Sequence, residues 1–391
     1  MRPSIAILGR SLEGEAPKRS RMCVQFSTLR AESSHPMTHR VTLIPGDGIG
    51  PEVCEAARRA IDATGATIEW DVQEFGADAY RREGGALLER VIGSVRERGV
   101  ALKGPTSTPS GGFRSINIAL RRELDLYAGV RPCRSLPGIP TPFPDTDVVI
   151  VRMNTEDLYA GIEYGREDEP TGAVRDLVAD TRGVELPADA GVSLKPLSHG
   201  ASARVARAAF EYARANSRAR VTAVHKATVM RATDGLFLEA CREVAADFTD
   251  VGFDDRLVDN ACAKLVMRPE ECDVLVMPMM YGDIVSDVGA GLIGGLGVAP
   301  GMNVGDEAAV FEAVHGSAPR HAGHNRANPF AAMLSGVMML RHLSEPDAAQ
   351  RLEDAIADVS REGRTLTYDI AREQPPASTS QVADAVVGRL R

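Results

Sequence analysis

The sequence contains no apolar run that approaches the roughly 18 to 20 residues needed to cross a bilayer, which argues against a membrane-spanning protein. Its cysteines show neither a CxxC pair nor a regular spacing, so the sequence suggests neither a zinc site nor a disulfide framework. We therefore expect a protein of the reducing cytoplasm. The six cysteines are Cys23, Cys54, Cys133, Cys241, Cys262 and Cys272.

Lysine is scarce as well, because arginine supplies almost all of the 45 basic residues. Arginine stays charged, whereas lysine can change its protonation state. A lysine in this background is therefore a candidate for chemistry that arginine cannot perform. The five lysines are Lys18, Lys103, Lys195, Lys226 and Lys264.

The charge balance is acidic, with a net charge of −9 and a pI near 5.5. This argues against nucleic acid or an anionic membrane as the main partner, and an anionic substrate would need a local basic cluster. The hydrophobic content of 44% and charged content of 25% are those of an ordinary globular protein. A chain of 391 residues can form two domains or one large α/β unit.

Residues 1–37 contain serine, arginine and proline without clear periodicity. Glu13, Glu15 and Glu32 are unusual in a transit peptide, and no apolar signal-peptide core with a cleavage site stands out. Met37 lies directly before the first strong strand and is an equally good start. We expect a disordered or spurious N-terminal extension.

From Val41 onward, apolar runs alternate with helical patterns, which is typical of an α/β fold with a mostly parallel sheet. The turn 46–50 reads GxGxG rather than GxGxxG and is a weak dinucleotide-binding signal. The expected strands are Val41 to Pro45, Thr67 to Phe75, Val100 to Lys103, Val148 to Val151, Val221 to Val224 and Val274 to Met277. The expected helices are Pro51 to Ile61, Ala86 to Arg98, Ala201 to Asn216, Gly235 to Phe248 and most of the chain after Pro329.

Residues 160–198 interrupt this alternation with a charged segment that contains proline and glycine. A short helix and a strand-like stretch, 191–195, follow within it. We expect a protruding arm that buries its apolar side on a partner subunit.

Residues 278–297 place two carboxylates, Asp283 and Asp287, four residues apart after an apolar run. If Asp283 begins a helix, both carboxylates lie on one face. Such a pair needs a cation, which a divalent metal supplies, although a solvated helix face is an equal alternative. The glycines from Gly289 to Gly297 indicate close backbone packing or a path to a ligand. Asp259 is a candidate third metal carboxylate, with a helix-surface position as the more ordinary explanation.

A glycine-rich polar loop, 103–114, runs into a predicted helix with Ser115 and Asn117 in its first turn. Arg121 follows four residues after Asn117. Amide donors, a hydroxyl and a guanidinium can therefore converge on one anion.

Arg131 and Arg152 lie at the ends of predicted elements and add two guanidinium groups to Arg121. Guanidinium matches carboxylate in bidentate fashion, so three arginines suit a di- or tricarboxylate. Surface arginines paired with Glu123 or Asp125 are the alternative.

Tyr159 and Lys226 are the candidates for proton transfer. Lys226 follows an apolar strand, where partial burial and nearby cations would lower its pKa toward a useful range. A lysine on a solvated strand edge is the usual alternative.

Residues 311–323, with Asn328 shortly after them, are too rich in small residues for a core element and predict a ligand loop. Basic and aromatic residues in and after this loop could form a phosphate pocket. These residues are Arg320, His321, Tyr368 and Arg372.

From about Val41 to the C-terminus, the chain resembles the metal-dependent decarboxylating dehydrogenases of the isocitrate and 3-isopropylmalate family. The resemblance rests on motifs in fixed order: IPGDGIGPEV, DLYAGVRP, VHKA, YGDIVSD, GLIGGLG and HGSAP. Ser115, Asn117 and Arg121 look like the isocitrate type, because isopropylmalate enzymes place apolar side chains on that helix. The arm 160–198 is similar to the clasp of bacterial NADP-dependent isocitrate dehydrogenases.

This resemblance implies a large discontinuous α/β domain of residues 38–126 and 294–391. It also implies a small domain of residues 127–293 that includes the clasp arm. The active site would lie in the cleft between the domains and be shared across a homodimer.

The resemblance further implies oxidation and decarboxylation of isocitrate to 2-oxoglutarate and CO2. Mg²⁺ or Mn²⁺ would bind Asp283 and Asp287 of one protomer, together with Asp259 of the other, and would chelate the substrate. Lys226 would help remove the proton of the C2 hydroxyl, and Tyr159 would protonate the carbon that loses CO2. The substrate carboxylates would be bound by Arg121, Arg131 and Arg152, and the remote one also by Ser115 and Asn117.

The cofactor would lie on the loop 312–328. NAD-using relatives usually place an Asp where Arg320 stands, to accept from the ribose 2′-hydroxyl and to repel a 2′-phosphate. The four pocket residues, Arg320, His321, Tyr368 and Arg372, look like an NADP pocket, so we predict NADP preference, with NAD possible. The other cofactor residues would be Thr108 near the nicotinamide, and His315, Gly316 and Asn328 at the adenosine.

Three positions beside the predicted catalytic residues depart from the family pattern. Met153 stands where Glu is usual, and Thr228 and Met279 stand where Asn is usual. They leave open a dehydrogenase for another 3-substituted malate, such as homoisocitrate, 3-isopropylmalate or a phosphono analogue. A non-catalytic regulatory subunit is a second alternative, which loss of Tyr159, Lys226 or an Asp ligand would favour; none is lost.

Overall fold

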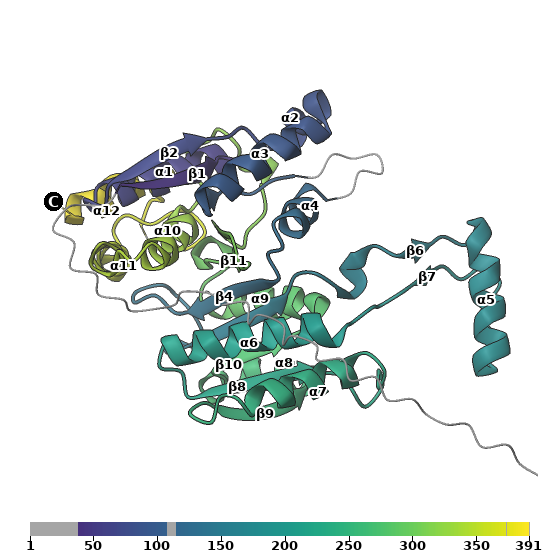
Figure 1. Cartoon of the computed structure of the whole chain (residues 1–391). Helices are drawn as coiled ribbons and strands as arrows, with labels where there is room; N and C mark the ends of the chain where they lie inside the picture. Colours follow the sequence, from purple (N-terminus) through teal and green to yellow (C-terminus); the bar gives the residue numbers. More distant parts are fainter. Residues whose placement is uncertain (1–37, 108–114, 373, 391) are drawn as a thin grey trace, which may run out of the picture.

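The computed structural model describes residues 38–107, 115–372 and 374–390, and these form the expected α/β fold (Figure 1). The predicted extension 1–37 lies outside the described residues. The strands are β1 (His39–Ile44), β2 (Ile68–Val72), β3 (Val100–Lys103), β4 (Ala128–Arg134), β5 (Asp147–Met153), β6 (Glu163–Tyr164), β7 (Val192–Ser193), β8 (Arg220–His225), β9 (Gly252–Leu257), β10 (Val274–Met277), β11 (Met302–Val304) and β12 (Ala309–Glu312). The α-helices are α1 (Gly50–Asp62), α2 (Ala77–Glu83), α3 (Gly85–Arg98), α4 (Ile116–Glu123), α5 (Glu169–Arg182), α6 (His199–Ala215), α7 (Asp234–Ala245), α8 (Val258–Met267), α9 (Met279–Leu292), α10 (Phe330–His342), α11 (Pro346–Glu362) and α12 (Thr379–Leu390). Short 3-10 helices are η1 (Asp157–Ala160), η2 (Pro269–Glu271), η3 (Leu296–Val298) and η4 (Pro319–His321).

A ten-stranded sheet runs through both halves of the chain, in the order β2-β1-β3-β12-β11-β4-β5-β10-β8-β9. Strands β1, β2, β3 and β12 pair in parallel on one side, and β5, β10, β8 and β9 do so on the other. Antiparallel β11 and β4 join the two halves. The carboxyl ends of β5, β8 and β10 therefore lie at one edge, which is where parallel sheets place ligand sites.

Strands β3 and β10 begin and end at the predicted residues, because their short apolar runs are buried throughout. Strands β4, β9, β11 and β12 were not predicted. Strand β9 lies at the sheet edge and reads GFDDRL, so it has no apolar run, and β11 has only 3 residues. The prediction that 311–323 contains no core element is wrong at its start, because Phe311 lies in β12 and is fully buried.

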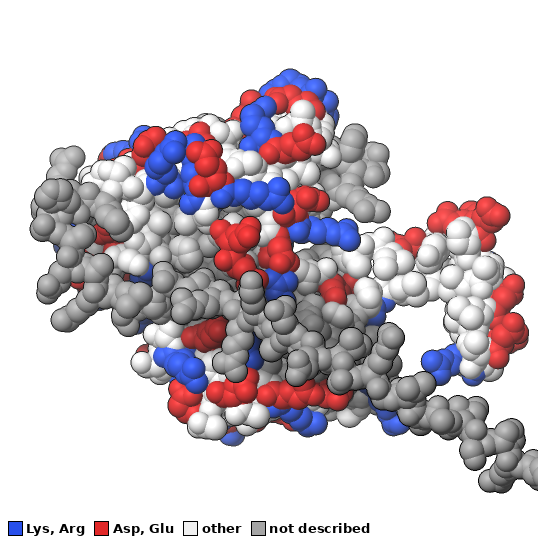
Figure 2. Space-filling model, viewed as in Figure 1, with Lys and Arg blue, Asp and Glu red and all other residues white. Residues whose placement is uncertain are grey.

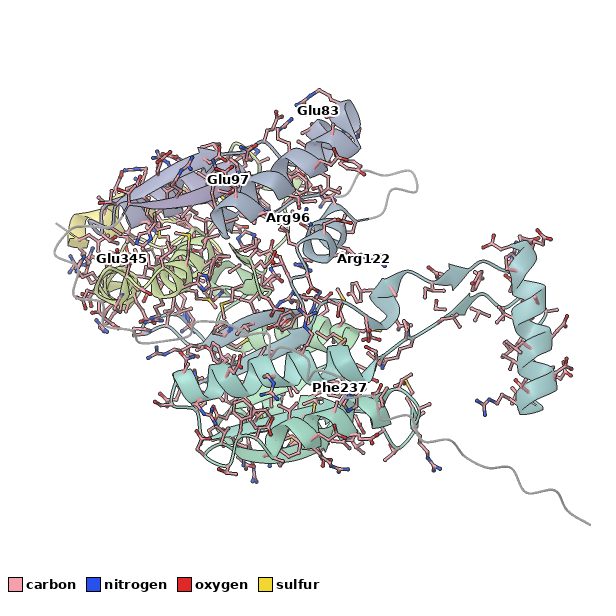
Figure 3. The ribbon with its side chains drawn as sticks, in the orientation of Figure 1. Glu83, Arg96, Glu97, Arg122, Phe237 and Glu345 are labelled. Atoms are coloured by element: carbon pink, nitrogen blue, oxygen red, sulfur yellow. The ribbon has the colours of Figure 1, made fainter. Side chains whose placement is uncertain are left out.

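Figure 1 shows two lobes joined along the sheet. The upper lobe contains α1, α2, α3, α10, α11 and α12, and the lower lobe contains α6 to α9. Apolar side chains fill both; Phe237 of α7, labelled in Figure 3, is fully buried in the lower lobe. The domain boundaries proposed at 126 and 294 stay a prediction.

The segment predicted to protrude does so, and projects from the lower lobe in Figure 1. Strands β6 and β7 form an antiparallel ribbon, with α5 at its end. Thr171 is the buried residue of α5, whereas Leu177 is 61% exposed. Burial of this apolar side on a partner subunit stays a prediction.

Acidic and basic side chains are interspersed over the upper lobe on the face drawn in Figure 2. Within the part of the chain that the structure describes, no helix has the length and apolar content needed to cross a membrane.

Candidate active site

Helix α9 carries both predicted metal carboxylates, and it begins at Met279, four residues before the start at Asp283 that the sequence analysis considered. The earlier start is stabilised from outside the helix, because the Asp157 carboxylate accepts the backbone N–H of Met280 at 2.8 Å. The spacing of four residues still places Asp283 and Asp287 on one face, one turn apart.

Asp283 is surrounded by groups that favour its charged form. Arg152 forms an ion pair and hydrogen bond with Oδ1, and Nη1 of Arg131 lies 3.4 Å from the same oxygen. The Tyr159 hydroxyl donates to Oδ2 at 2.5 Å. Asp283 therefore belongs to a polar cluster in which the arginines are its cations, whereas Asp287 on the same helix face is exposed.

The two carboxylates have pKa values shifted in opposite directions. Burial raises the pKa of Asp283, but the charge of Arg152 and the Tyr159 hydroxyl outweigh burial and hold that pKa below its usual value. Burial also raises the pKa of Asp287; Arg131 opposes this shift and the charge of Asp283 adds to it. Asp287 therefore lacks the close cationic partner that Asp283 has, and a further cation would stabilise its charged form.

Glycine at position 282 allows the close approach of Arg152 to α9. A Cβ at Gly282 would lie 2.6 Å from Cβ and Cγ of Arg152, closer than real side chains approach. The sheet register brings Arg152 of β5 beside Met277, the last residue of β10 before α9. The glycine and the strand pairing together place the guanidinium beside Asp283.

The three predicted arginines come from separate elements, and burial and their charges lower the pKa values of Arg131 and Arg152. Arg121 lies on α4, Arg131 on β4 and Arg152 on β5. Burial and the charge of Arg121 lower the pKa of Arg131, and burial and the charge of Arg131 lower that of Arg152. Mutually repelling guanidinium groups favour an anion placed between them. The alternative pairing of these arginines with Glu123 or Asp125 is wrong.

Helix α4 has Ser115 as its N-cap, whose hydroxyl accepts from the Ile118 N–H at 3.5 Å. Asn117, in the first turn, accepts from the Thr106 hydroxyl at 2.5 Å. In this chain both side chains are engaged locally, and Asn117 keeps a position on the cavity wall.

A cavity of about 130 Å³ brings predicted substrate and cofactor residues together. Asn117, Arg121 and Arg131 line it from one side, and His315 and Gly316 line it from the ligand loop. Residues that are nearly 200 positions apart in sequence thus share one site.

Glu312 binds several residues of the cavity wall and was not predicted from the sequence. Its carboxylate accepts from Lys103 at 2.6 Å, from Arg121 at 2.7 Å and from the Asn303 amide at 2.8 Å. Burial raises the pKa of Glu312, but Lys103 and Arg121 outweigh it and hold the pKa far below its usual value. The scarcity of lysine pointed to Lys103, but no sequence pattern indicated its partner.

Lys226 and Asp259 form a second group. The Lys226 ammonium donates to Asp259 at 2.6 Å, and its backbone N–H donates to the buried Asp234 at 2.7 Å. The charged neighbour that the structure shows for Lys226 is therefore a carboxylate, and not the cations that we expected. The Asp259 side chain is 66% exposed, at the start of α8.

Among residues 38–107, 115–372 and 374–390, no three His, Cys, Asp or Glu side chains are grouped so that they could hold a metal ion. Asp259 thus does not join Asp283 and Asp287 within one chain. A site made of these three residues would need a second chain.

The glycine turn 46–50 supports the ligand loop by close packing. A Cβ at Gly46, where φ is 76°, would lie 2.2 Å from the Pro105 carbonyl oxygen, and one at Gly48, where φ is 61°, would lie 1.9 Å from that of Ser317. The Ile49 N–H donates to the Ser317 carbonyl at 2.9 Å. These contacts account for the glycines without a dinucleotide at this turn.

The predicted cofactor residues include two histidines that each have a ring nitrogen without a hydrogen-bond partner among the described residues. Nδ1 of His315 lies 3.0 Å from the Gly316 carbonyl, which can only accept, so Nδ1 bears the proton. Burial lowers the pKa of His315, and its buried Nε2 has no hydrogen-bond partner among the described residues. Nδ1 of His321 is likewise buried without a partner there.

Aromatic and basic pocket residues lie close together near the loop. His321 stacks on Tyr368 with ring centroids 5.4 Å apart, and the Arg326 guanidinium lies 4.1 Å from the Tyr368 ring centroid. Arg320 and Arg372 are exposed. The predicted cofactor residue Asn328 is buried and donates to Asp369, the residue after Tyr368, at 3.0 Å. Thr108 lies outside the described residues.

The decisive observation is that a family model described as isocitrate/isopropylmalate dehydrogenase matches residues 40–386. The chain belongs to this family. Its members are oxidoreductases that decarboxylate their substrates, and the fold and motifs predicted from the sequence are those of the family.

Relatives and solved structures agree with this assignment. The chain is 44% identical over 366 residues to isocitrate dehydrogenase [NAD] catalytic subunit 5, mitochondrial, of Arabidopsis thaliana, covering 93% of this chain and 92% of that protein. It is 42% identical to a mitochondrial protein of Dictyostelium discoideum that is named as a regulatory subunit of isocitrate dehydrogenase [NAD], covering 93% and 96%. The crystal structure of isocitrate dehydrogenase from Methylococcus capsulatus is similar with a TM-score of 0.82 and 46% identity, covering 90% and 99%.

The three departures from the family pattern lie in different surroundings. Met153 and Met279 are buried, at the end of β5 and at the start of α9, whereas Thr228 is exposed after β8. Each lies near the edge of the sheet where the polar clusters gather.

Proposed function

We propose that the chain catalyses the metal-dependent oxidative decarboxylation of isocitrate to 2-oxoglutarate and CO2 with reduction of NADP. The observation that supports this most is that Asn117, Arg121 and Arg131 line one cavity, while the buried Arg152 adjoins Arg131 through their shared partner Asp283. Three guanidinium groups match a tricarboxylate better than a dicarboxylate with an apolar substituent.

The donor set fits a hard divalent cation. Asp283 and Asp287 offer carboxylate oxygens on one helix face, and Mg²⁺ and Mn²⁺ prefer such ligands. When bound there, the cation would supply Lewis acidity at the substrate's C2 oxygen. Asp259 of a second protomer would complete the set.

Tyr159 suits the role of general acid. Burial and the adjacent Asp283 carboxylate raise its pKa to about 12, so the hydroxyl stays protonated near neutral pH. It already points its proton at Asp283, and a substrate carbon placed there would receive it. We assign Lys226 to the proton of the C2 hydroxyl.

The surroundings of the ligand loop support NADP over NAD. NADP differs from NAD by one 2′-phosphate, which basic residues recognise and a carboxylate repels. The Arg326 guanidinium lies over the ring of Tyr368, on which His321 stacks, and Arg320, next to His321 in sequence, is exposed, as is Arg372. The two relatives described above are NAD enzymes by name, so cofactor preference is the part of the proposal that depends on this chain's own residues.

A homodimer with shared sites accounts for two features of the lower lobe. Asp259 and Lys226 form a pair apart from Asp283, so a second chain would supply both to the metal cluster. Apolar side chains on the adjacent helices α8 and α9 are also exposed, notably Met267 at 71% and Ile284 at 53%. Burial of such side chains on a second copy would stabilise the dimer.

The test is nicotinamide reduction at 340 nm with D-threo-isocitrate, Mg²⁺ and either NADP or NAD. We expect turnover with a higher kcat/KM for NADP than for NAD. A higher kcat/KM with NAD would refute the cofactor assignment. Turnover restricted to homoisocitrate, 3-isopropylmalate or a phosphono analogue would refute isocitrate as substrate. No turnover with any of these would favour a regulatory role, which is the role that the Dictyostelium relative's name gives.

A further inference from the structure

Lys195 lies at the root of the arm, just after β7, and none of the roles above uses it. Its side chain is 13% exposed, and its ammonium group donates to Oδ1 of Asp234 at 2.5 Å. The same nitrogen lies 3.8 Å from Oδ1 of Asp157. Both carboxylates are fully buried, and among the described residues Lys195 is the ion-pair partner of each. One ammonium thus compensates two buried negative charges.

Asp157 connects the segment of Tyr159 to α9. Its Oδ1 accepts the Leu158 N–H at 2.8 Å, and its Oδ2 accepts the Met280 N–H at 2.8 Å. Its φ is 72°, a left-handed conformation that costs a non-glycine residue about 1 to 3 kcal/mol. The surrounding contacts must stabilise this conformation. Tyr159 follows only two residues later, so its place relative to α9 depends on this carboxylate.

Asp234 connects Lys226, the residue after β8, to helix α9. Its Oδ2 accepts the backbone N–H of Lys226 at 2.7 Å and the Tyr281 hydroxyl at 3.1 Å. Tyr281 lies on α9, two residues before Asp283, and the Lys195 ammonium lies 4.6 Å from its ring centroid. The backbone of Lys226 is thus attached to the same helix as the metal carboxylates.

We propose that Lys195 is a positioning residue for the reaction. Its ammonium holds the Asp157 and Asp234 carboxylates together, and through them it fixes Tyr159 and Lys226 relative to α9. The inference rests on the proposed function, because it assumes that Tyr159 is catalytic in the site of its own chain and Lys226 in the site of the partner. Without the ammonium, two buried carboxylates repel each other and move apart, so the N–H groups that they bind are released.

The first test replaces Lys195 by methionine, which has similar length and no charge. We expect kcat to fall on the order of 10- to 100-fold, as displacement of catalytic groups by about 1 Å does. KM for isocitrate should change less than about threefold, because Arg121 and Arg131 lie outside this network. Lys264→Met is the matched control, since Lys264 forms an ion pair with Glu271 on the surface. Equal kcat values for wild type and Lys195→Met would overturn the proposal.

The second test asks whether Lys195 acts through Asp234. Asp234→Asn keeps an oxygen acceptor and removes the charge, so Lys195→Met/Asp234→Asn has no unpaired buried carboxylate at this position and should fold if Lys195→Met does not. We expect Lys195→Met to lower kcat by a clearly smaller factor in the Asp234→Asn background than in wild type, because only the effect through Asp157 remains, which is non-additivity. The same factor in both backgrounds would overturn the route through Asp234.

The third test does not depend on turnover. Amide hydrogen exchange should accelerate in Lys195→Met for peptides that contain the N–H groups of Lys226 and Met280, with β1 unchanged. Unchanged exchange there overturns the positioning role even if the enzyme is inactive. Accelerated exchange together with no isocitrate turnover by wild type would instead refute isocitrate as the substrate. The kcat test would then use the substituted malate that wild type turns over.

Discussion

Glu312 shows how one buried carboxylate organises the substrate wall. It accepts from Lys103, Arg121 and Asn303, and its low pKa reflects two cations at close range. Without Glu312, the charges of Lys103 and Arg121 would remain in a cleft from which water is partly excluded, with no carboxylate to compensate them. The orientation of Arg121 in the cavity therefore depends on Glu312.

We expect Glu312→Gln to lower the free energy of unfolding by about 3 kcal/mol at pH 7. The folded-state pKa of Glu312 lies below the ordinary value of 4.5, so its stabilising effect is present above pH 4.5 and is lost as pH falls. Urea unfolding between pH 7 and pH 3 should thus show a difference between wild type and Glu312→Gln that shrinks in acid. Glu97→Gln is the control, since Glu97 is 62% exposed. A difference that grows in acid would contradict the assignment.

Arg320 decides how a 2′-phosphate is received, if the proposed cofactor pocket is correct. We expect Arg320→Asp to lower kcat/KM with NADP by about 10- to 100-fold, because a charged hydrogen bond is lost and a repulsion is gained. With NAD, kcat/KM should rise or stay constant. Steady-state kinetics with both cofactors check this, with Arg81→Asp on α2 as the control. Equal losses with both cofactors would show that Arg320 does not discriminate between them.

Single residues divided sharply into those that the sequence revealed and those that it did not. Arg121, Arg131, Arg152, Tyr159 and Asp283 could be named as candidates because their motifs and their places at element ends are local signals. Glu312 was missed because its cationic partners are 209 and 191 positions away along the chain. Nothing local distinguishes such a carboxylate from a surface one.

At the scale of elements, α9 joins the proposed metal carboxylates, Asp283 and Asp287, to the sheet. The four-residue spacing of Asp283 and Asp287 predicted that both lie on one face of this helix, but the sequence did not predict the residue at which the helix begins. The start at Met279 depends on Asp157, which lies 123 positions earlier and caps the N–H of Met280. Element ends are set by such distant contacts, whereas element interiors follow from local apolar patterns.

Two glycines of α9 allow a matched test. In Gly282→Ala, the new Cβ would meet Arg152 at 2.6 Å, so we expect a loss of stability of about 1 to 3 kcal/mol and a fall in kcat as Arg152 and Asp283 separate. In Gly291→Ala, nothing lies within 4 Å of the new Cβ, so stability should rise by up to about 1 kcal/mol. Urea unfolding and steady-state kinetics measure both. Similar effects at the two positions would show that packing against Arg152 is not what requires Gly282.

At the scale of the whole molecule, the sheet joins two lobes, and apolar side chains stay exposed on the lower lobe and on the arm. These include Met267 at the end of α8, Ile284 next to Asp283 on α9, and Leu177 on the arm. Sequence alone predicted an arm that meets a partner, because 160–198 interrupts the alternation of strands and helices. It could not pair Lys226 with Asp259, since that contact is a property of the folded chain.

A shared active site makes a prediction that no single-chain site makes. Tyr159→Phe and Lys226→Met should each lower kcat at least about 100-fold. If Lys226 comes from one protomer and Tyr159 from the other, a mixed dimer of the two variants contains one site with both substitutions and one site with neither. Co-expression with random assortment makes about half of the dimers mixed, so activity should recover to about a quarter of wild type. Size-exclusion chromatography with light scattering should give about twice the chain mass of 41.8 kDa. If each site were built within one chain, every site in the mixture would keep one substitution, and activity would stay at the level of the separate variants.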